Sequence, residues 1–299
     1  SALCPFTYGI TEDGGLLPPA DGHLTALALE YGVQTLLHLS TLAEGGGFSS
    51  LRAQAVLESD ALRARLIAET VAQMRRGGYG GVDVDFEFLG AELADAFAGF
   101  LGELRAAVHA AGGIVVCALA PKTSAEQRGV LYEGHDYRRI GENADAVLLM
   151  TYEWGYTYGP PMAVAPIGAV RRVVEYALTQ IPASKILLGF PNYAYDWTLP
   201  YAAGESRARS LGNEAAAALA VQVGAEIRFD ETAQTPYFSY TDRTGAAHEV
   251  WFEDARSCAA KYDLAQEYSL RGFGFWNFMR PFTAAFALLN ARFTILPGV

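Results

Sequence analysis

The chain is poor in cysteine and has no long apolar run, and each shortage narrows what it can be. Its 299 residues include only Cys4, Cys117 and Cys258, at spacings that fit neither a metal site nor a disulfide framework. Cys117 lies inside an apolar strand pattern, so we interpret it as a small buried hydrophobic side chain. No apolar run approaches the roughly 20 residues of a membrane-spanning helix, and no membrane partner is expected.

Charge is also scarce. Asp, Glu, Lys and Arg make up 18% of the residues, and the net charge is −11. This balance disfavours a nucleic acid or an anionic membrane as partner, and it suits an uncharged or positively charged ligand. The 51% hydrophobic residues suffice for one large core. We therefore expect a single domain over residues 1–299, and we expect the chain to be a monomer. No signal peptide is visible, which leaves the compartment open.

The most informative stretch that is present carries three acids at alternate positions. Asp83, Asp85 and Glu87 are separated by Val84 and Phe86. In a β-strand, alternate side chains share a face, so the acids would line one face and the apolar residues, with Val82 and Phe88, the other. A buried row of acids raises at least one pKa, which is how a carboxylic acid stays protonated and acts as a general acid.

A strand with acids on one face usually belongs to an antiparallel sheet that exposes this face to solvent, and that alternative has to be weighed. Here the opposite face is wholly apolar, Gly80 and Gly81 precede the run, and a long helix pattern lies on each side. These features favour a strand in a βα unit, where both faces are covered.

Strand patterns alternate with helix patterns along most of the chain. Strands are expected near residues 3, 34, 81, 114, 146, 185 and 271, which predicts an α/β fold with a mostly parallel sheet. A helix and three short strands break the alternation, so residues 205–253 are interpreted as a small α+β insertion before the last strand. A (β/α)8 TIM barrel needs one more strand. Either the first barrel strand is missing, or Arg292–Leu296 replaces it.

Polar and aromatic residues gather where the expected strands end. Barrel active sites are built at the C-terminal ends of the strands, so these residues are candidates for a site with Glu87. The candidates for binding are Tyr8, Tyr152, Glu153, Asn192, Tyr193 and Trp276. His38, inside a strand, is interpreted as a core histidine.

Residues 81–87, Gly-Val-Asp-Val-Asp-Phe-Glu, resemble the signature Asp-Gly-x-Asp-x-Asp-x-Glu of glycoside hydrolase family 18, the chitinase family. The departure is Gly80, where the family usually has its outermost Asp. Met150-Thr151-Tyr152-Glu153 resembles the family's Met-x-Tyr-Asp, with Glu in place of Asp, and Trp276 resembles the Trp that ends the eighth strand. The 152–156, 251–255 and 275–277 segments resemble the branch of spore-cortex and cell-wall glucosaminidases.

The resemblance implies a TIM barrel and hydrolysis with retention, in which the substrate's own acetamido group attacks the anomeric carbon. Glu87 would be the acid, Asp85 would orient the acetamido group, and Asp83 would share a proton with Asp85. Tyr152 and Glu153 would hold the acetamido group, and Trp276 would stack beneath the sugar. No metal or cofactor is implied.

The implied substrate is peptidoglycan of the cell wall or spore cortex, cleaved after N-acetylglucosamine, which implies an extracellular or spore location. Three alternatives stay open. One is a sugar-binding protein without activity, which the presence of Glu87 disfavours. Another is a chitinase, or another N-acetylglucosaminidase acting on chitin-type glycans. The third is a two-carboxylate glycosidase with Glu153 as the second acid.

Overall fold

The structure is a computed structural model that describes residues 1–6, 9–17, 20–42 and 47–298. The chain divides into two compact units. The first contains residues 1–149, 176–187 and 295–299, and the second contains residues 150–175 and 188–294. Within the described ranges, no helix is long and apolar enough to cross a membrane.

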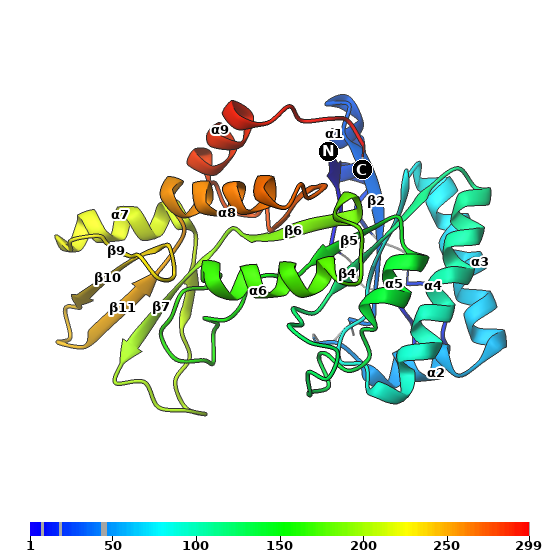
Figure 1. Cartoon of the computed structure of the whole chain (residues 1–299), viewed down its shortest axis with the longest axis horizontal. Coiled ribbons are helices and arrows are strands. Elements are labelled where there is room, and N and C mark those ends of the chain that lie inside the picture. The colour runs from blue at the N-terminus through cyan, green and yellow to red at the C-terminus, as the bar shows by residue number, and fades with distance from the viewer. Residues whose placement is uncertain (7–8, 18–19, 43–46, 299) are drawn as a thin grey trace. The chain divides into compact units, whose positions relative to one another are not determined.

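The first unit is built on parallel strands in the order β1-β2-β3-β4-β5. Their bounds are β1 (Ala2–Leu3), β2 (Gln34–Ser40), β3 (Gly81–Asp85), β4 (Ile114–Leu119) and β5 (Ala146–Leu149). The helices between them are α1 (Gly22–Glu30), α2 (Ser50–Leu57), α3 (Asp60–Gly77), α4 (Ala94–Ala110) and α5 (Tyr137–Asn143), with a short 3-10 turn at Ala91–Leu93. Helices α3, α4 and α5 run side by side (Figure 1).

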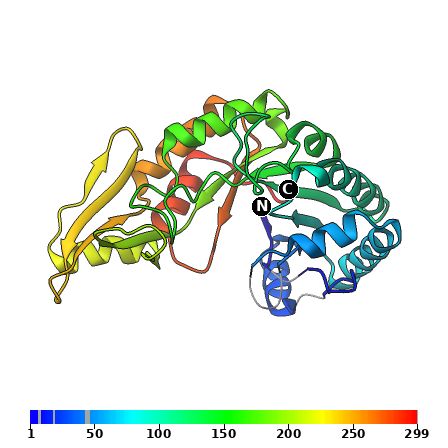
Figure 2. The same ribbon diagram turned by 90° about the horizontal axis from the view of Figure 1, so that it is seen from below.

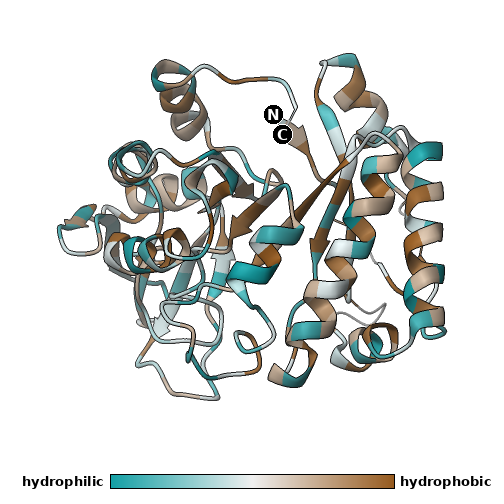
Figure 3. Cartoon of the chain, turned by 45° about the vertical axis from the view of Figure 1, so that its right-hand side comes forward, coloured by the Kyte–Doolittle hydropathy of each residue, from teal (hydrophilic) through white to brown (hydrophobic). Residues whose placement is uncertain are grey.

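The helices of the first unit are amphipathic. In Figure 3, at the right, they carry apolar and polar residues in alternation along their length. The apolar face of β3 packs beneath α4, where the Phe86 ring stacks on Phe97 and Phe100 at centroid distances of 5.5 and 5.4 Å. Burial of such rings is the main stabilising contribution of this face, roughly 1.5–3 kcal/mol for each large side chain. The expected division of β3 into an acidic and an apolar face is confirmed for Val82, Val84 and Phe86, which are all fully buried.

Phe88 was expected on the same face, and that expectation is wrong. Strand β3 ends at Asp85, and Phe88 has a positive φ of 57° and is exposed. The chain therefore turns immediately after Glu87. The main-chain N–H of Gly134 donates to the carbonyl of Leu89 in this turn, at 3.0 Å. A Cβ on Gly134 would lie 2.3 Å from Leu89 Cβ, so glycine allows this close approach.

In the second unit the end of β6 (Ile186–Pro191) lies next to β12 (Gly272–Trp276). Helices α6 (Ile167–Leu178), α8 (Ala255–Glu267) and α9 (Thr283–Arg292) accompany them, and a 3-10 turn at Ala183–Lys185 precedes β6. All seven strands expected from the helix and strand patterns are therefore present.

A separate antiparallel sheet in the second unit has the order β8-β7-β11-β10-β9. Its strands are β7 (Ala194–Leu199), β8 (Arg209–Leu211), β9 (Arg228–Asp230), β10 (Thr235–Thr241) and β11 (Ala247–Trp251). Helix α7 (Asn213–Val223) covers one face, where Ala216 and Ala220 pack on Phe238 and Val250 (Figure 2). The sheet begins with β7, before the range 205–253 expected for an insertion.

The expected tail strand at Arg292–Leu296 is wrong. Helix α9 extends through Arg292, and residues 293–298 form no strand. Phe293 instead packs against Tyr262 and Phe273, with ring centroids 5.7 and 5.5 Å away. In the first unit, the N-terminal amine of Ser1 donates to the carbonyl oxygens at positions 296 and 298. The alternative of a missing first strand stays a prediction.

Two of the three cysteines are fully buried, one in each unit. Cys117 lies on β4 in the first unit and Cys258 on α8 in the second, and both are free thiols with no exposed surface. The interpretation of Cys117 as a buried small side chain is confirmed. Cys4 is half-buried.

Candidate active site

Asp83 is held by two donors, one on the neighbouring strand β2 and one in the segment after β1. The parallel register places His38 of β2 directly beside Asp83 of β3. His38 Nδ1 lies 2.9 Å from Asp83 Oδ2, and the Cys4 thiol donates to the same oxygen at 3.2 Å. Burial alone would lower the pKa of His38, but the hydrogen bond and the charge of Asp83 raise it on balance. His38 is thus buried as expected, and it also orients a predicted catalytic acid.

Cys4, His38 and Asp83 also bring three possible metal-ligand atoms within 4.8 Å of one another. Sulfur, imidazole nitrogen and carboxylate oxygen are the donors that zinc accepts. Burial, followed by the charge of Asp83, raises the pKa of Cys4 well above its ordinary value, so the thiol keeps its proton. A protonated thiol and a histidine that both donate to Asp83 account for this arrangement as a hydrogen-bonded group.

Asp85 is buried two residues further along the same face of β3, and its environment disfavours charge. Burial and, to a smaller degree, the charge of Asp83 raise the pKa of Asp85 to about 6, although His38 lowers it. Its Oδ1 is buried and accepts no hydrogen bond from the described part of the chain. This oxygen is an acceptor that is available to a ligand or water as far as the described residues are concerned.

Glu87 is half-buried and stands two residues beyond the end of β3. The strand alternation therefore does not fix its direction, and the turn that follows must do so. His135 Nε2 lies 2.9 Å from the carbonyl oxygen of Phe86, and its Nδ1 accepts from the N–H of Ala120 at 2.9 Å. Burial lowers the pKa of His135 to about 4, so the ring is neutral and Nε2 carries the proton.

His135 is a residue that the sequence reasoning missed, because it lies in a polar loop without a strand or helix pattern. Its carbonyl oxygen accepts from Lys122 Nζ at 3.0 Å. Tyr137 donates to the carbonyl of Ala120, which ties the end of β4 to α5. The loop after β4 thus supports the segment that carries Glu87.

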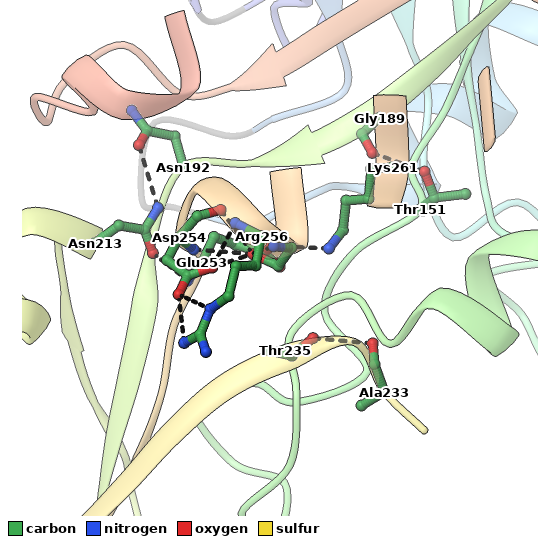
Figure 4. A network of polar contacts seen from close by, with 11 residues as sticks. Thr151, Gly189, Asn192, Asn213, Ala233, Thr235, Glu253, Asp254, Arg256 and Lys261 are labelled. Atoms are coloured by element: carbon green, nitrogen blue, oxygen red, sulfur yellow. Dashed lines mark hydrogen bonds and ion pairs between the residues drawn. The ribbon is translucent and has the colours of Figure 1, made fainter. Parts of the chain in front are cut away.

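In the second unit, Glu153 follows β5 in a left-handed conformation with φ 65°. The hydroxyls of Tyr193 and Tyr195 donate to its Oε1 at 3.4 and 3.5 Å. Burial raises the pKa of Glu153, and these two hydroxyls lower it in part. Thr151 fixes the start of the segment by donating to the carbonyl of Gly189 at 2.8 Å, as Figure 4 shows.

Aromatic side chains form one cluster around Glu153. Tyr193, Tyr195 and Trp197 are buried, and the partly buried Tyr152 and Trp276 pack against them. The cluster therefore brings together three of the predicted binding residues, Tyr152, Tyr193 and Trp276. Tyr195 was missed, although the alternation of Tyr193, Tyr195 and Trp197 in the sequence was a strand signal. Flat aromatic faces with a nearby carboxyl group suit a sugar ring and its polar substituents.

Asn192, predicted to bind substrate, is completely buried. Its side-chain nitrogen donates to the carbonyl oxygens of Asn277 and Arg280, at 2.7 and 2.8 Å. Tyr8 lies outside the residues that the structure describes.

Two features now define a class of protein: parallel strands alternating with helices, and an Asp-x-Asp-x-Glu sequence whose two Asp residues lie on β3 and whose Glu follows it. The sequence model of "Glycosyl hydrolases family 18" matches residues 24–280. The chain belongs to glycoside hydrolase family 18 and is a glycosidase with an α/β fold of the TIM-barrel type.

The chain is similar to proteins named as cortical fragment-lytic or spore cortex-lytic enzymes, and to a chitinase. It is 44% identical over 294 residues to the cortical fragment-lytic enzyme of Bacillus subtilis, covering 98% of this chain and 68% of that protein. Among solved structures, the spore cortex-lytic enzyme SleL of Bacillus megaterium is 39% identical, with a TM-score of 0.95, covering 100% of this chain and 68% of that one. A chitinase from Chromobacterium violaceum is 26% identical, with a TM-score of 0.89, over 97% of this chain and 90% of that one. The resemblance to the spore-cortex branch is confirmed.

Proposed function

We propose that this glycosidase cleaves β-1,4 linkages after N-acetylglucosamine in peptidoglycan, by substrate-assisted catalysis with retention. The observation that carries the mechanism is the state of Asp85. It is a buried carboxyl group with a pKa raised to about 6, and one of its oxygens has no hydrogen-bond partner among the residues that the structure describes. An acetamido N–H is the donor that such an oxygen would accept, and family 18 enzymes use the substrate's acetamido oxygen as nucleophile.

In this mechanism Glu87 protonates the glycosidic oxygen as the bond to the anomeric carbon breaks. The acetamido oxygen of the same sugar attacks that carbon and forms a cyclic oxazolinium ion. Asp85 accepts a hydrogen bond from the acetamido N–H and stabilises the positive charge. Glu87, now ionised, takes a proton from the water that opens the ring, which restores both groups.

The remaining roles follow from each unit's own contacts. Asp83 is fixed by His38 and Cys4, and its electrostatic effect adds to that of burial in raising the pKa of Asp85. We propose in addition that Asp83 shares a proton with Asp85, as the family resemblance implies. We propose that Tyr152 and Glu153 hold the acetamido group, that Trp276 stacks beneath the sugar, and that Tyr193 supports Glu153.

The peptidoglycan substrate is supported by relatives named for lysis of the spore cortex or its fragments. We propose an extracellular location at the cell wall or spore cortex, with the chain acting as a monomer on a glycan that contains N-acetylglucosamine. The net charge of −11 makes nucleic acid an unfavourable partner. We also propose that residues 1–299 form one catalytic barrel domain with residues 205–253 as an insertion. Chitin is the second candidate substrate, favoured by the similarity to the Chromobacterium chitinase.

The test is hydrolysis of purified peptidoglycan, with and without the spore-cortex modification, and of chitin oligosaccharides. Wild type and Glu87→Gln are compared on each. Products with a reducing-end N-acetylglucosamine, absent from the variant, would support the proposal. Release from chitin alone would favour the second candidate, and equal turnover by both proteins would refute the role of Glu87. Full activity on a substrate without the 2-acetamido group would point to a two-carboxylate mechanism with Glu153.

A further inference from the structure

Asn192 makes every hydrogen bond that its main-chain and side-chain N–H groups can donate, and all of them go to the last residue of β12 and the loop that follows it. Its main-chain N–H donates to the carbonyl of Trp276 at 2.7 Å. The two hydrogens of its side-chain nitrogen are taken by the carbonyl oxygens of Asn277 and Arg280. One fully buried residue therefore fixes three carbonyl groups of the segment that carries Trp276.

The side-chain oxygen of Asn192 accepts a hydrogen bond from a residue outside that loop. Asn213, the first residue of α7, donates to it at 3.4 Å, and the oxygen of Asn213 accepts from the N–H of Glu253 at 2.9 Å. Glu253 in turn pairs with Lys261 of α8 at 2.8 Å. Figure 4 shows this row of side chains, and each of them is at most 1% exposed. The row is directional, because each amide donates with its nitrogen and accepts with its oxygen.

Further bonds join the same loop to the start of α7. Arg280 donates to Ser210 on β8 at 2.9 Å, and the N–H of Thr283 donates to the carboxylate of Glu214 on α7 at 2.7 Å. The loop between β12 and α9 is thus held by the part of the chain that forms the antiparallel sheet and its helix.

We propose that Asn192 is a positioning residue which, through Asn213, lets the β8–α7 segment set the place of Trp276. This inference rests on the proposed function, in which Trp276 stacks beneath the sugar. A direct contact of Asn192 with substrate would require its nitrogen to leave a carbonyl oxygen, and an unpaired buried carbonyl is unfavourable. The β8–α7 segment then affects catalysis because it fixes the geometry of the loop between β12 and α9.

Two aspartate substitutions separate positioning from direct contact. Asn192→Asp places a carboxylate oxygen against two carbonyl oxygens, so it releases the loop. Asn213→Asp keeps the oxygen that Glu253 needs and replaces the donor to Asn192 by a carboxylate oxygen, which cannot donate. Asn143→Asp is the matched control, because Asn143 also donates to a main-chain carbonyl, that of Arg139 on α5.

The first measurement is hydrogen–deuterium exchange of residues 277–283 without any sugar. Faster exchange of this segment in both Asn192→Asp and Asn213→Asp, and not in Asn143→Asp, is expected. The second is the affinity for a chitin or peptidoglycan oligosaccharide, with each change made in the Glu87→Gln background. Each change is expected to weaken binding by about three- to tenfold, which corresponds to the net contribution of about one hydrogen bond. The double variant should lose no more than the larger single loss, because both changes break one path.

Loss of binding in Asn192→Asp with none in Asn213→Asp would overturn the proposal in favour of direct contact. Unchanged exchange of residues 277–283 in both variants would overturn it as well. The exchange measurement does not depend on turnover, so it tests the positioning role by itself. A failure of the proposed function would be seen separately, because wild type would then hydrolyse no glycan. If Asn192→Asp does not fold, the Asn213→Asp result decides, because that change leaves the three donors of Asn192 in place.

Discussion

His135 Nε2 donates a hydrogen bond of 2.9 Å to the carbonyl oxygen of Phe86, the residue before Glu87. The two residues are 49 positions apart, and the bond joins the loop after β4 to the turn after β3. The ring is neutral and both of its nitrogens are occupied, so the contact is specific for one tautomer. This relationship aligns the main chain from which the proposed general acid projects.

Replacing His135 by Leu should therefore lower kcat by about 10–100-fold, because a small displacement of an acid costs this much. KM should change little, since the sugar-holding residues are untouched. Two buried main-chain groups lose their partner, so the free energy of unfolding should fall by about 2–4 kcal/mol. Kinetics and urea unfolding measure both effects. His135→Gln should recover part of kcat by keeping a donor, and exposed His23→Leu is the control. A kcat equal to that of wild type in His135→Leu would contradict the positioning role.

Asp85→Asn should stabilise the fold while it removes activity. The pKa of Asp85 is raised from 3.8 to about 6. Proton binding to Asp85 therefore contributes stability that is fully present below the ordinary pKa and is lost as the pH rises through about 6. Asparagine stays neutral, so the variant should be more stable than wild type by about 1–3 kcal/mol at neutral pH. The difference should shrink as the pH falls to about 4. Thermal melting at several pH values measures it, and a constant difference would contradict the raised pKa.

The pH profile of kcat/KM should have an acidic limb near 6. The proposed role of Asp85 requires its ionised form, and this form is lost as the pH falls through the raised pKa of about 6. The groups that face Asp85 are Asp83, His38 and the thiols of Cys4 and Cys117, and of these the His38 charge pulls the limb to lower pH. His38→Gln should move the limb upward. Initial rates at constant ionic strength measure this, and a flat profile between about pH 5 and 7 would speak against the assignment.

Tyr195→Phe should raise KM for the glycan with little change in kcat. The hydroxyl of Tyr195 donates to Glu153 Oε1 at 3.5 Å, and its loss leaves the carboxyl group less well oriented. One such bond is worth about 0.5–1.5 kcal/mol, which corresponds to a rise in KM of about two- to tenfold. Tyr240→Phe removes a hydroxyl from Asp196 in the antiparallel sheet and is the matched control. An equal change of KM in the two variants would show that the effect is general.

Lys261→Met should be among the most damaging single changes to stability. Lys261 and Glu253 form an ion pair of 2.8 Å in which both side chains are at most 1% exposed. Removing one partner leaves a buried charge uncompensated, which costs about 3–5 kcal/mol. Urea unfolding measures the loss. The double change Lys261→Met with Glu253→Gln should recover part of it, and a single variant as stable as wild type would contradict the prediction.

Local patterns predicted much of the fold. The seven parallel strands follow from apolar runs, and the acids of β3 from their alternation with Val84 and Phe86. The wrong predictions concern residues whose conformation depends on contacts with segments that are distant in the sequence. Phe88 leaves the apolar face because the loop around Gly134 turns the chain, and residues after Arg292 form no strand because Phe293 packs against Tyr262.

The same distinction applies to the site. Asp83 and Asp85 were predicted from their spacing, and Tyr152 and Trp276 from their places at strand ends, to which the family resemblance added roles. His135 was not found, because its role depends on a loop brought beside Phe86 by the fold. The burial of Asn192 could not be read from its position at a strand end, since that requires knowing that residues 277–280 lie against it.

Each unit contains one buried thiol, whose reaction with a thiol reagent can report local unfolding of that unit. Cys117 lies in the first unit and Cys258 in the second, and neither has exposed surface. A thiol reagent can modify them only when the surrounding structure opens, so each rate of labelling reports the free energy of opening around one cysteine. With Cys4 replaced by Ser, mass spectrometry of the two cysteine peptides would show whether the units open together or one before the other. Equal free energies of opening would indicate a single cooperative transition, and unequal ones would identify the less stable unit without any engineered label.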